Sequence, residues 1–130
     1  MALAKANLGF PQNISAGTTA TVYTVANSKT AYIRGISIHN TSVGTGNESV
    51  SQHAQIYVVE NNSGSVGVAT AGDRIVRVTL APDDTFVYEL QYPVILDTNN
   101  DTVQVFNEGT HNSGSATNDI NVLILGDAES

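Results

Sequence analysis

The residues best spaced to do chemistry are the oxygen donors of the string Asp97-Thr98-Asn99-Asn100-Asp101. Asp97, Asn99 and Asp101 match the first three ligand positions of a calcium-binding loop, and Glu108 falls at the twelfth. The sixth position, where such a loop needs glycine, is Thr102, and the residues after it alternate as a strand does. Asn and Asp are also the usual residues of a β-turn. We therefore predict a polar turn and no cofactor, with a calcium loop as the alternative.

No other set of residues has a spacing that indicates catalysis. His39, His53 and His111 are too far apart along the chain for a metal-binding pair on one strand or helix. The two Ser-Gly-Ser motifs lack the strand, sharp turn and helix that surround a nucleophilic serine. There are no cysteines, which excludes thiol catalysis, cysteine-based zinc sites and disulfides. The sequence predicts that the protein is not an enzyme.

The composition limits the class of partner. Of the 130 residues only 13% are charged, and the net charge is -7 with five basic residues. Because no basic stripe can be assembled, we expect neither nucleic-acid binding nor attraction to anionic membranes. No stretch approaches the roughly 18 apolar residues of a membrane span. The N-terminus does not have the pattern of a signal peptide, so we expect the chain to be used as synthesised.

The segment Thr19–Asn40 organises the predicted fold. It reads as two strands joined by a tight turn, because β-branched and aromatic residues flank Ala-Asn-Ser-Lys. In the second strand Ala31 and Ile33 share one parity, whereas the isoleucines at 36 and 38 share the other. Gly35 stands where the parity changes, which predicts a β-bulge.

Further alternating runs predict strands along the rest of the chain. The clearest is 74–80, where Val76, Val78 and Leu80 share one face. The last strand, 119–125, is apolar on both parities, which predicts a central strand covered on both faces. About eight short strands with no helical stretch predict an all-β, antiparallel β-sandwich that is jelly-roll-like.

Three regions divide the chain in this interpretation. Residues 1–15 form an N-terminal arm or a short first strand, residues 16–126 a single β-sandwich domain, and residues 127–130 an acidic tail. Leu3, Leu8 and Phe10 make the arm too apolar for a purely solvated segment. We expect these three side chains to contact a neighbouring subunit or their own domain.

Two parts of the sequence resemble a known family. Val22-Tyr23-Thr24-Val25, then Ser28 to Arg34, then Ile36 to Asn40, resemble a hairpin of small structural proteins of tailed bacteriophages. Thr85 to Leu90, Pro93 to Leu96 and Asp101-Thr102-Val103 are similar to the second half of those proteins. The turn has Ala26-Asn27 where the family often has Pro-Ala or Pro-Gly. The resemblance covers roughly two thirds of the chain and brings no catalytic residues.

The resemblance implies a structural virion protein of a tailed phage. The absence of cysteines favours assembly in the reducing cytoplasm of the host. The expected role is a capsid decoration or cement protein that binds across subunits of the major capsid protein. The expected assembly is a homo-oligomer, with a trimer favoured. The alternative is a neck, tail or fibre-associated sandwich that binds glycans. In that case the five tyrosines would stack on sugars, although strand tyrosines more often pack at half-buried edges or interfaces.

Overall fold

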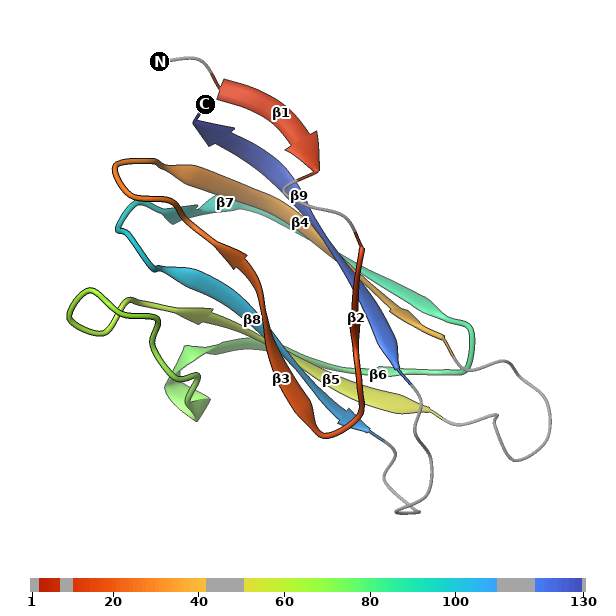
Figure 1. The fold of residues 1–130 in the computed structure, drawn as a ribbon. Helices are drawn as coiled ribbons and strands as arrows, with labels where there is room; N and C mark the ends of the chain where they lie inside the picture. The colour runs from red at the N-terminus through yellow and green to blue at the C-terminus, as the bar shows by residue number, and fades with distance from the viewer. Residues whose placement is uncertain (1–2, 8–10, 42–50, 110–118, 130) are drawn as a thin grey trace.

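The computed structural model describes residues 3–7, 11–41, 51–109 and 119–129. It consists of two antiparallel sheets packed face to face (Figure 1). Sheet A contains β1 (Leu3–Asn7), β2 (Gln12–Ile14), β4 (Ala31–Asn40), β7 (Thr85–Leu96) and β9 (Ile120–Glu129). Sheet B contains β3 (Thr18–Thr24), β5 (Gln52–Val59), β6 (Arg74–Leu80) and β8 (Thr102–Gly109). A 3₁₀ turn, η2 (Ala71–Asp73), precedes β6.

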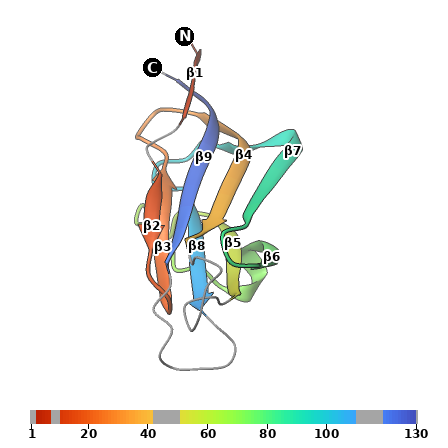
Figure 2. The ribbon, with the colours of Figure 1, turned by 90° about the vertical axis from the view of Figure 1, so that its right-hand side faces the viewer.

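The order of the strands is that of a jelly roll. Sheet A has the order β2-β9-β4-β7, with β1 also on β9, and sheet B has the order β3-β8-β5-β6. Among the described strands from β2 onward, each strand is followed by a strand of the other sheet, with one exception. The exception is β5 and β6, which are neighbours in sheet B. This connectivity confirms the predicted jelly-roll sandwich, which is built from two Greek keys. Figure 2 shows β2 and β3 along one open side of the sandwich and β6 and β7 along the other.

Aliphatic side chains from both sheets fill the space between them. The buried core residues are Ile14, Val22, Val25, Ala31, Ile33, Ile36, Ile38, Ala54, Ile56, Leu80, Leu96, Val103, Val105, Ile120, Val122 and Ile124. Most are β-branched, and this side-chain shape packs well on a pleated sheet. The two sheets therefore share one aliphatic core.

The predicted bulge in β4 is confirmed. The register of β4 shifts between Ile33 and Gly35 against both neighbours. Against β9, Arg34 is the one extra residue, whereas against β7 residues 90–93 form a longer irregular stretch in β7 itself. Gly126 of β9 lies opposite Ile33, and a Cβ atom there would be 2.1 Å from the carbonyl oxygen of Tyr32. The bulge therefore brings the two backbones so close that β9 needs glycine at this position.

The hairpin predicted for Thr19–Asn40 is wrong. The strands β3 and β4 do form, but β3 pairs with β8 in sheet B, whereas β4 pairs with β7 and β9 in sheet A. The turn between them carries the chain from one sheet to the other. The physical reason is that both strands bury their apolar faces in the same core, as Val22 and Ile33 do from opposite sides.

Two predictions for the C-terminal segment also need correction. The strand β9 is central in its sheet, as expected, but Leu125 on its outer face is 39% exposed and is therefore not covered. The predicted acidic tail continues β9 as far as Glu129. Asp127 is held by the guanidinium of Arg34, and a Glu129 carboxylate oxygen accepts a hydrogen bond from the Thr30 amide at 2.9 Å.

The N-terminal segment follows the edge of β9. β1 pairs with the last residues of β9, from Leu3 opposite Glu129 to Asn7 opposite Leu125. β2 pairs with its first residues, and Ile14 enters the core. Figure 1 shows both termini at the same end of the molecule.

Candidate functional site

The strongest candidate for a binding site is one end of the sandwich, where β5, β6 and β7 meet the loop 60–70. We call Val58, Glu60, Val68, Ile75, Ile95 and Asp97 the end surface. Two open pockets of about 510 Å³ and 330 Å³ lie on this surface and share Val58, Val59 and Glu60. Volumes of this size are in the range of pockets that bind side chains or small molecules.

The loop begins with a tight turn. Asn62 and Ser65 exchange two backbone hydrogen bonds, of 2.7 Å and 3.0 Å. Ser63 and Gly64, which lie between them, both have positive φ angles, as a two-residue hairpin turn of the primed type requires. The side-chain oxygen of Asn61 accepts a further hydrogen bond from the Gly64 amide at 3.1 Å. The polar residues of this loop therefore fix its shape.

Amide side chains of β8 and of the turn before it anchor the loop to sheet B. The Nε2 atom of Gln104 donates to the carbonyl oxygen of Gly67 at 2.9 Å, and Nδ2 of Asn100 donates to that of Gly64 at 2.6 Å. A Cβ atom at Gly67 would be 2.6 Å from the Glu60 carbonyl oxygen and 2.9 Å from a methyl group of Val59. The loop thus lies directly on Val59.

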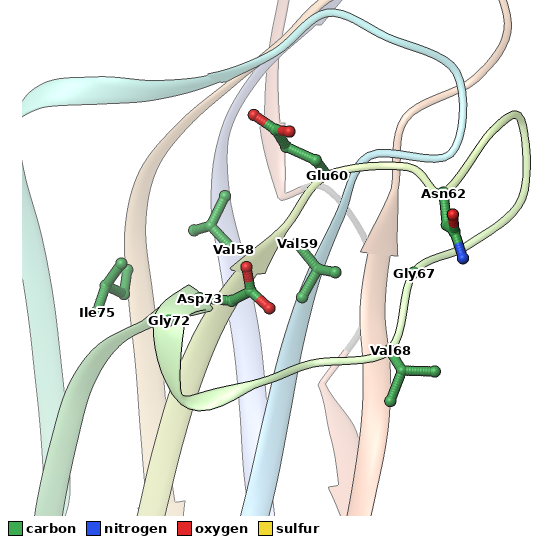
Figure 3. A pocket seen from close by; sticks show the side chains of 9 residues that line it. All are labelled: Val58, Val59, Glu60, Asn62, Gly67, Val68, Gly72, Asp73 and Ile75. Carbon is green, nitrogen blue, oxygen red and sulfur yellow. The ribbon is translucent and has the colours of Figure 1, made fainter.

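The larger pocket lies between this loop and the start of β6. Figure 3 shows Val68 on the loop and Ile75 on the opposite side, with Val58, Val59 and Asp73 between them. The lining residues are Val58, Val59, Glu60, Asn62, Gly67, Val68, Gly72, Asp73 and Ile75. Asp73 accepts hydrogen bonds from the amide and the hydroxyl of Thr70, at 2.8 Å and 2.9 Å. Its carboxylate therefore holds η2 in place.

The smaller pocket lies between the ends of β5 and β7. Its lining residues are Val58, Val59, Glu60, Asn61, Ile95, Leu96, Asp97, Thr98 and Asp101. Neither pocket is lined by a Lys, Arg or His side chain, whereas four carboxylates contribute to the two linings. Glu60 and Asp97 are exposed. The two pockets consequently share an aliphatic floor at Val58 and Val59, and the exposed carboxylates of Glu60 and Asp97 lie at the rim.

Asp97 and Asp101 both line the smaller pocket, but the described residues of the calcium-loop alternative do not form a metal-binding group there. Asp97 is exposed, but Asp101 is only 8% exposed, and its carboxylate accepts the backbone amides of Asn61 and Thr98, at 2.9 Å and 3.1 Å. Asn99 is exposed in the turn between them. Within the described ranges no three His, Cys, Asp or Glu side chains are grouped to hold a metal ion.

Glu108 lies in β8, and its carboxylate accepts hydrogen bonds from the Arg77 guanidinium at 2.8 Å and 3.3 Å. Desolvation by burial acts to raise the pKa of Glu108. Hydrogen bonds from Arg77 and Gln55, together with the charges of Arg77 and His53, outweigh it, so the pKa lies below its ordinary value. Glu108 therefore serves this ion pair and lies away from the Asp97 turn.

The predicted interface residues are only partly described. Leu3 is the first residue of β1, where its backbone pairs with that of Glu129. Leu8 and Phe10 lie outside the described residues. The contact of this arm with a neighbouring subunit stays a prediction.

The histidines considered as metal ligands and the tyrosines considered as sugar-stacking residues lie at separate places on the molecule. His39 contacts Thr85 at 2.8 Å and Asp83 at 3.3 Å, and His53 contacts Thr79 at 2.9 Å. His111 lies outside the described residues. Tyr92 is 78% exposed, whereas the other four tyrosines are half-buried. Burial raises the pKa of the Tyr23 hydroxyl.

Sequence reasoning missed the end surface because no local pattern marks it. Its residues come from three strands and two loops that meet only in the folded chain. The one available signal is Val66 and Val68, two aliphatic residues in an otherwise polar loop. Their spacing predicts at most a short edge strand, but the loop contains a single isolated bridge, between Asn62 and Ser65.

Comparison with known proteins gives no family for this chain. No protein-family model matches it, and no curated protein sequence matches it significantly. Among solved structures, the "nora virus structure" matches with a TM-score of 0.41 and 10% identity over 99% of this chain and 60% of that one. The "Structure of infectious bursal disease virus Gt strain" gives a TM-score of 0.40 and 10% identity over 98% of this chain and 32% of that one.

This chain therefore spans less than two thirds of both viral chains. A search of the described helical residues for a membrane-spanning helix finds none of sufficient length and hydrophobicity.

Proposed function

We propose that this protein is a structural virion protein of a tailed phage that decorates the capsid. The observation that carries the proposal is the jelly-roll strand order, an architecture used by capsid and lectin domains. Because one fold hosts many functions, the strand order needs support from the residues. That support is the resemblance of residues 22–40 and 85–103 to small phage structural proteins.

In the proposed role the protein binds across subunits of the major capsid protein and adds interface that resists internal pressure. In this role the protein is a homo-oligomer, with a trimer favoured. It is assembled in the host cytoplasm and is part of the virion. The low charge content of 13% suits a surface that packs against other proteins. The N-terminal arm, with Leu3, Leu8 and Phe10, supplies the contact with a neighbour.

Removal of residues 1–10 tests this role. The described part of this segment, β1, pairs with β9 alone, so the truncated chain is expected to keep the sandwich and its far-ultraviolet circular dichroism. Binding is measured by co-sedimentation with purified phage heads that lack the protein. We expect the intact chain to sediment with the heads and the truncated chain to stay in solution. A folded truncation that still sediments contradicts the role given to the arm.

A neck, tail or fibre-associated protein that binds glycans is the second candidate. The exposure of Tyr92 favours it, because an exposed aromatic ring offers a stacking platform for a sugar. Glycan-array binding that is lost in Tyr92→Ala, with Tyr88→Phe as the half-buried control, would support this candidate over decoration. An array without binding would remove it.

A further inference from the structure

We infer that the end surface binds an extended segment of a partner protein that carries aliphatic side chains and at least one Lys or Arg. The inference rests on the proposed function, because it names the surface through which the protein would hold a virion partner. It differs from the arm contact in location and in chemistry. Exposure, charge and the sheet edge beside the pockets all support it.

The first support is the gathering of aliphatic side chains. Val68 is 84% exposed, Ile95 54% and Ile75 38%. Single exposed aliphatic residues are ordinary on a protein surface, but a cluster rimmed by polar groups indicates a site for another protein. These three residues surround two pockets that adjoin at Val58 and Glu60, so they form one surface.

The second support is charge complementarity. The carboxylates of Asp73 and Asp101 already accept hydrogen bonds within the protein. Asp73 accepts from Thr70, and Asp101 accepts from Asn61 and Thr98. Glu60 and Asp97 are exposed, one at the junction of the two pockets and the other at the rim of the smaller one. With no basic side chain in either lining, the surface favours a partner that brings its own Lys or Arg.

The third support is the edge of sheet B. Among the described strands β6 pairs with β5 alone, so its other edge has backbone amides and carbonyls without a strand partner. The strand β6 begins beside the larger pocket, at Arg74 and Ile75. An extended segment can add to such an edge through its backbone while its side chains enter neighbouring pockets. The partner segment is therefore extended.

The test uses the full chain and two synthetic peptides. The first is an eight-residue peptide of alternating Leu and Lys, and the second has Glu in place of every Lys. Titration of ¹⁵N-labelled protein with the Lys peptide should shift the amide signals of Glu60, Ile75 and Ile95. The Glu60→Lys/Asp97→Lys variant should bind the Lys peptide at least about tenfold more weakly. The affinity of the native chain for the Glu peptide should be equally low, at or below the affinity of the variant for the Lys peptide.

Matched control variants distinguish binding at the end surface from nonspecific binding elsewhere on the protein. Glu89 is exposed on β7 and faces outward from sheet A, so Glu89→Lys changes charge elsewhere and should alter affinity less than about twofold. Val87 is 52% exposed on the same face, so Val87→Ser is the control for Ile95→Ser, which should weaken binding. Circular dichroism verifies that each variant is folded.

Three outcomes overturn the inference. One is a set of shifts spread over the surface, or an equal loss of affinity in Glu89→Lys. A second is equal affinity for the Glu peptide. A third comes from native mass spectrometry without peptide. If the native chain is an oligomer and the Glu60→Lys/Asp97→Lys variant has a smaller mass, the end surface binds a second copy of this chain. Binding of the intact chain to phage heads tests the proposed function separately. The decoration role and the peptide-binding end surface can therefore be disproved independently.

Discussion

Arg34 and Asp127 show how a single ion pair is placed by an irregularity of the sheet. Arg34 is the bulged residue of β4, and its Nε atom donates to the Asp127 carboxylate, whose side chain is 6% exposed. Arg34→Met leaves this buried carboxylate without its charged donor. We expect the free energy of unfolding to fall by about 2 kcal/mol in urea denaturation.

Arg77→Met provides the comparison, since Arg77 and Glu108 form a more exposed pair that should contribute less than about 1 kcal/mol. The double variant Arg34→Met/Asp127→Asn should regain part of the loss, because it removes the buried charge as well. Equal losses in Arg34→Met and Arg77→Met would show that burial of Asp127 does not matter.

The Glu108 pair predicts a dependence of stability on pH. The pKa of Glu108 is lower in the folded protein than in the unfolded chain, because its hydrogen bonds and nearby positive charges outweigh desolvation. Its contribution is therefore fully present above the ordinary glutamate pKa of about 4.3 and is lost as pH falls through the lower folded value. Glu108→Gln should accordingly be less stable than the native chain at pH 7, by less than about 1 kcal/mol.

Urea denaturation at pH 7 and near pH 3 measures this difference. We expect the gap between Glu108→Gln and the native chain to shrink at the lower pH. In an Arg77→Gln background the gap should already be smaller at pH 7, because the main partner is gone. A gap that widens as the pH falls would mean that the pKa of Glu108 is raised on folding instead of lowered.

At the scale of elements, the close pairing of β4 and β9 at the bulge depends on Gly126. A Cβ atom at this position meets the Tyr32 carbonyl oxygen at 2.1 Å and the Ile33 Cα atom at 3.2 Å, and both belong to the backbone. Since backbone cannot move aside as a flexible side chain can, Gly126→Ala should destabilise the fold by about 2–3 kcal/mol.

Gly72→Ala is the matched control for this substitution. A Cβ atom there lies 3.7 Å from the nearest atom, the Thr70 hydroxyl oxygen, which is ordinary contact. Thermal unfolding of the two variants should therefore separate clearly, with Gly72→Ala close to the native chain. Similar melting temperatures would mean that β4 and β9 can move apart at the bulge.

The sequence predicts individual strands better than their partners. The bounds of β6 follow from aliphatic residues that alternate without interruption over 74–80, and the bulge at Gly35 follows from a change of parity. The hairpin of β3 and β4 is wrong because turn residues fix the reversal of the chain but not the sheet it enters. The end surface was not predictable, since residues of β5, β6 and β7 meet there only after the strands are ordered.

At the scale of the whole molecule, the open sheet edges bear on assembly. Among the described strands, β1, β2, β3, β6 and β7 each pair with a single strand. Natural sheets protect such edges with bulges, charge or proline, and β7 carries Pro93 beside its irregular segment. β3 and β6 contain no proline; β3 carries no charged residue, whereas β6 carries Arg74 and Arg77. These edges are where we expect other subunits to bind.

Native mass spectrometry of the purified chain, with and without calcium, tests the predicted assembly. We expect a discrete small oligomer, with a trimer at three times 13.6 kDa favoured. Added calcium should leave this mass unchanged, because Asp101 already accepts two backbone amides and Glu108 pairs with Arg77. A chelator should likewise leave the melting temperature unchanged. A monomer would contradict the oligomer, and a mass increase in calcium would instead support a metal site at Asp97, Asn99 and Asp101.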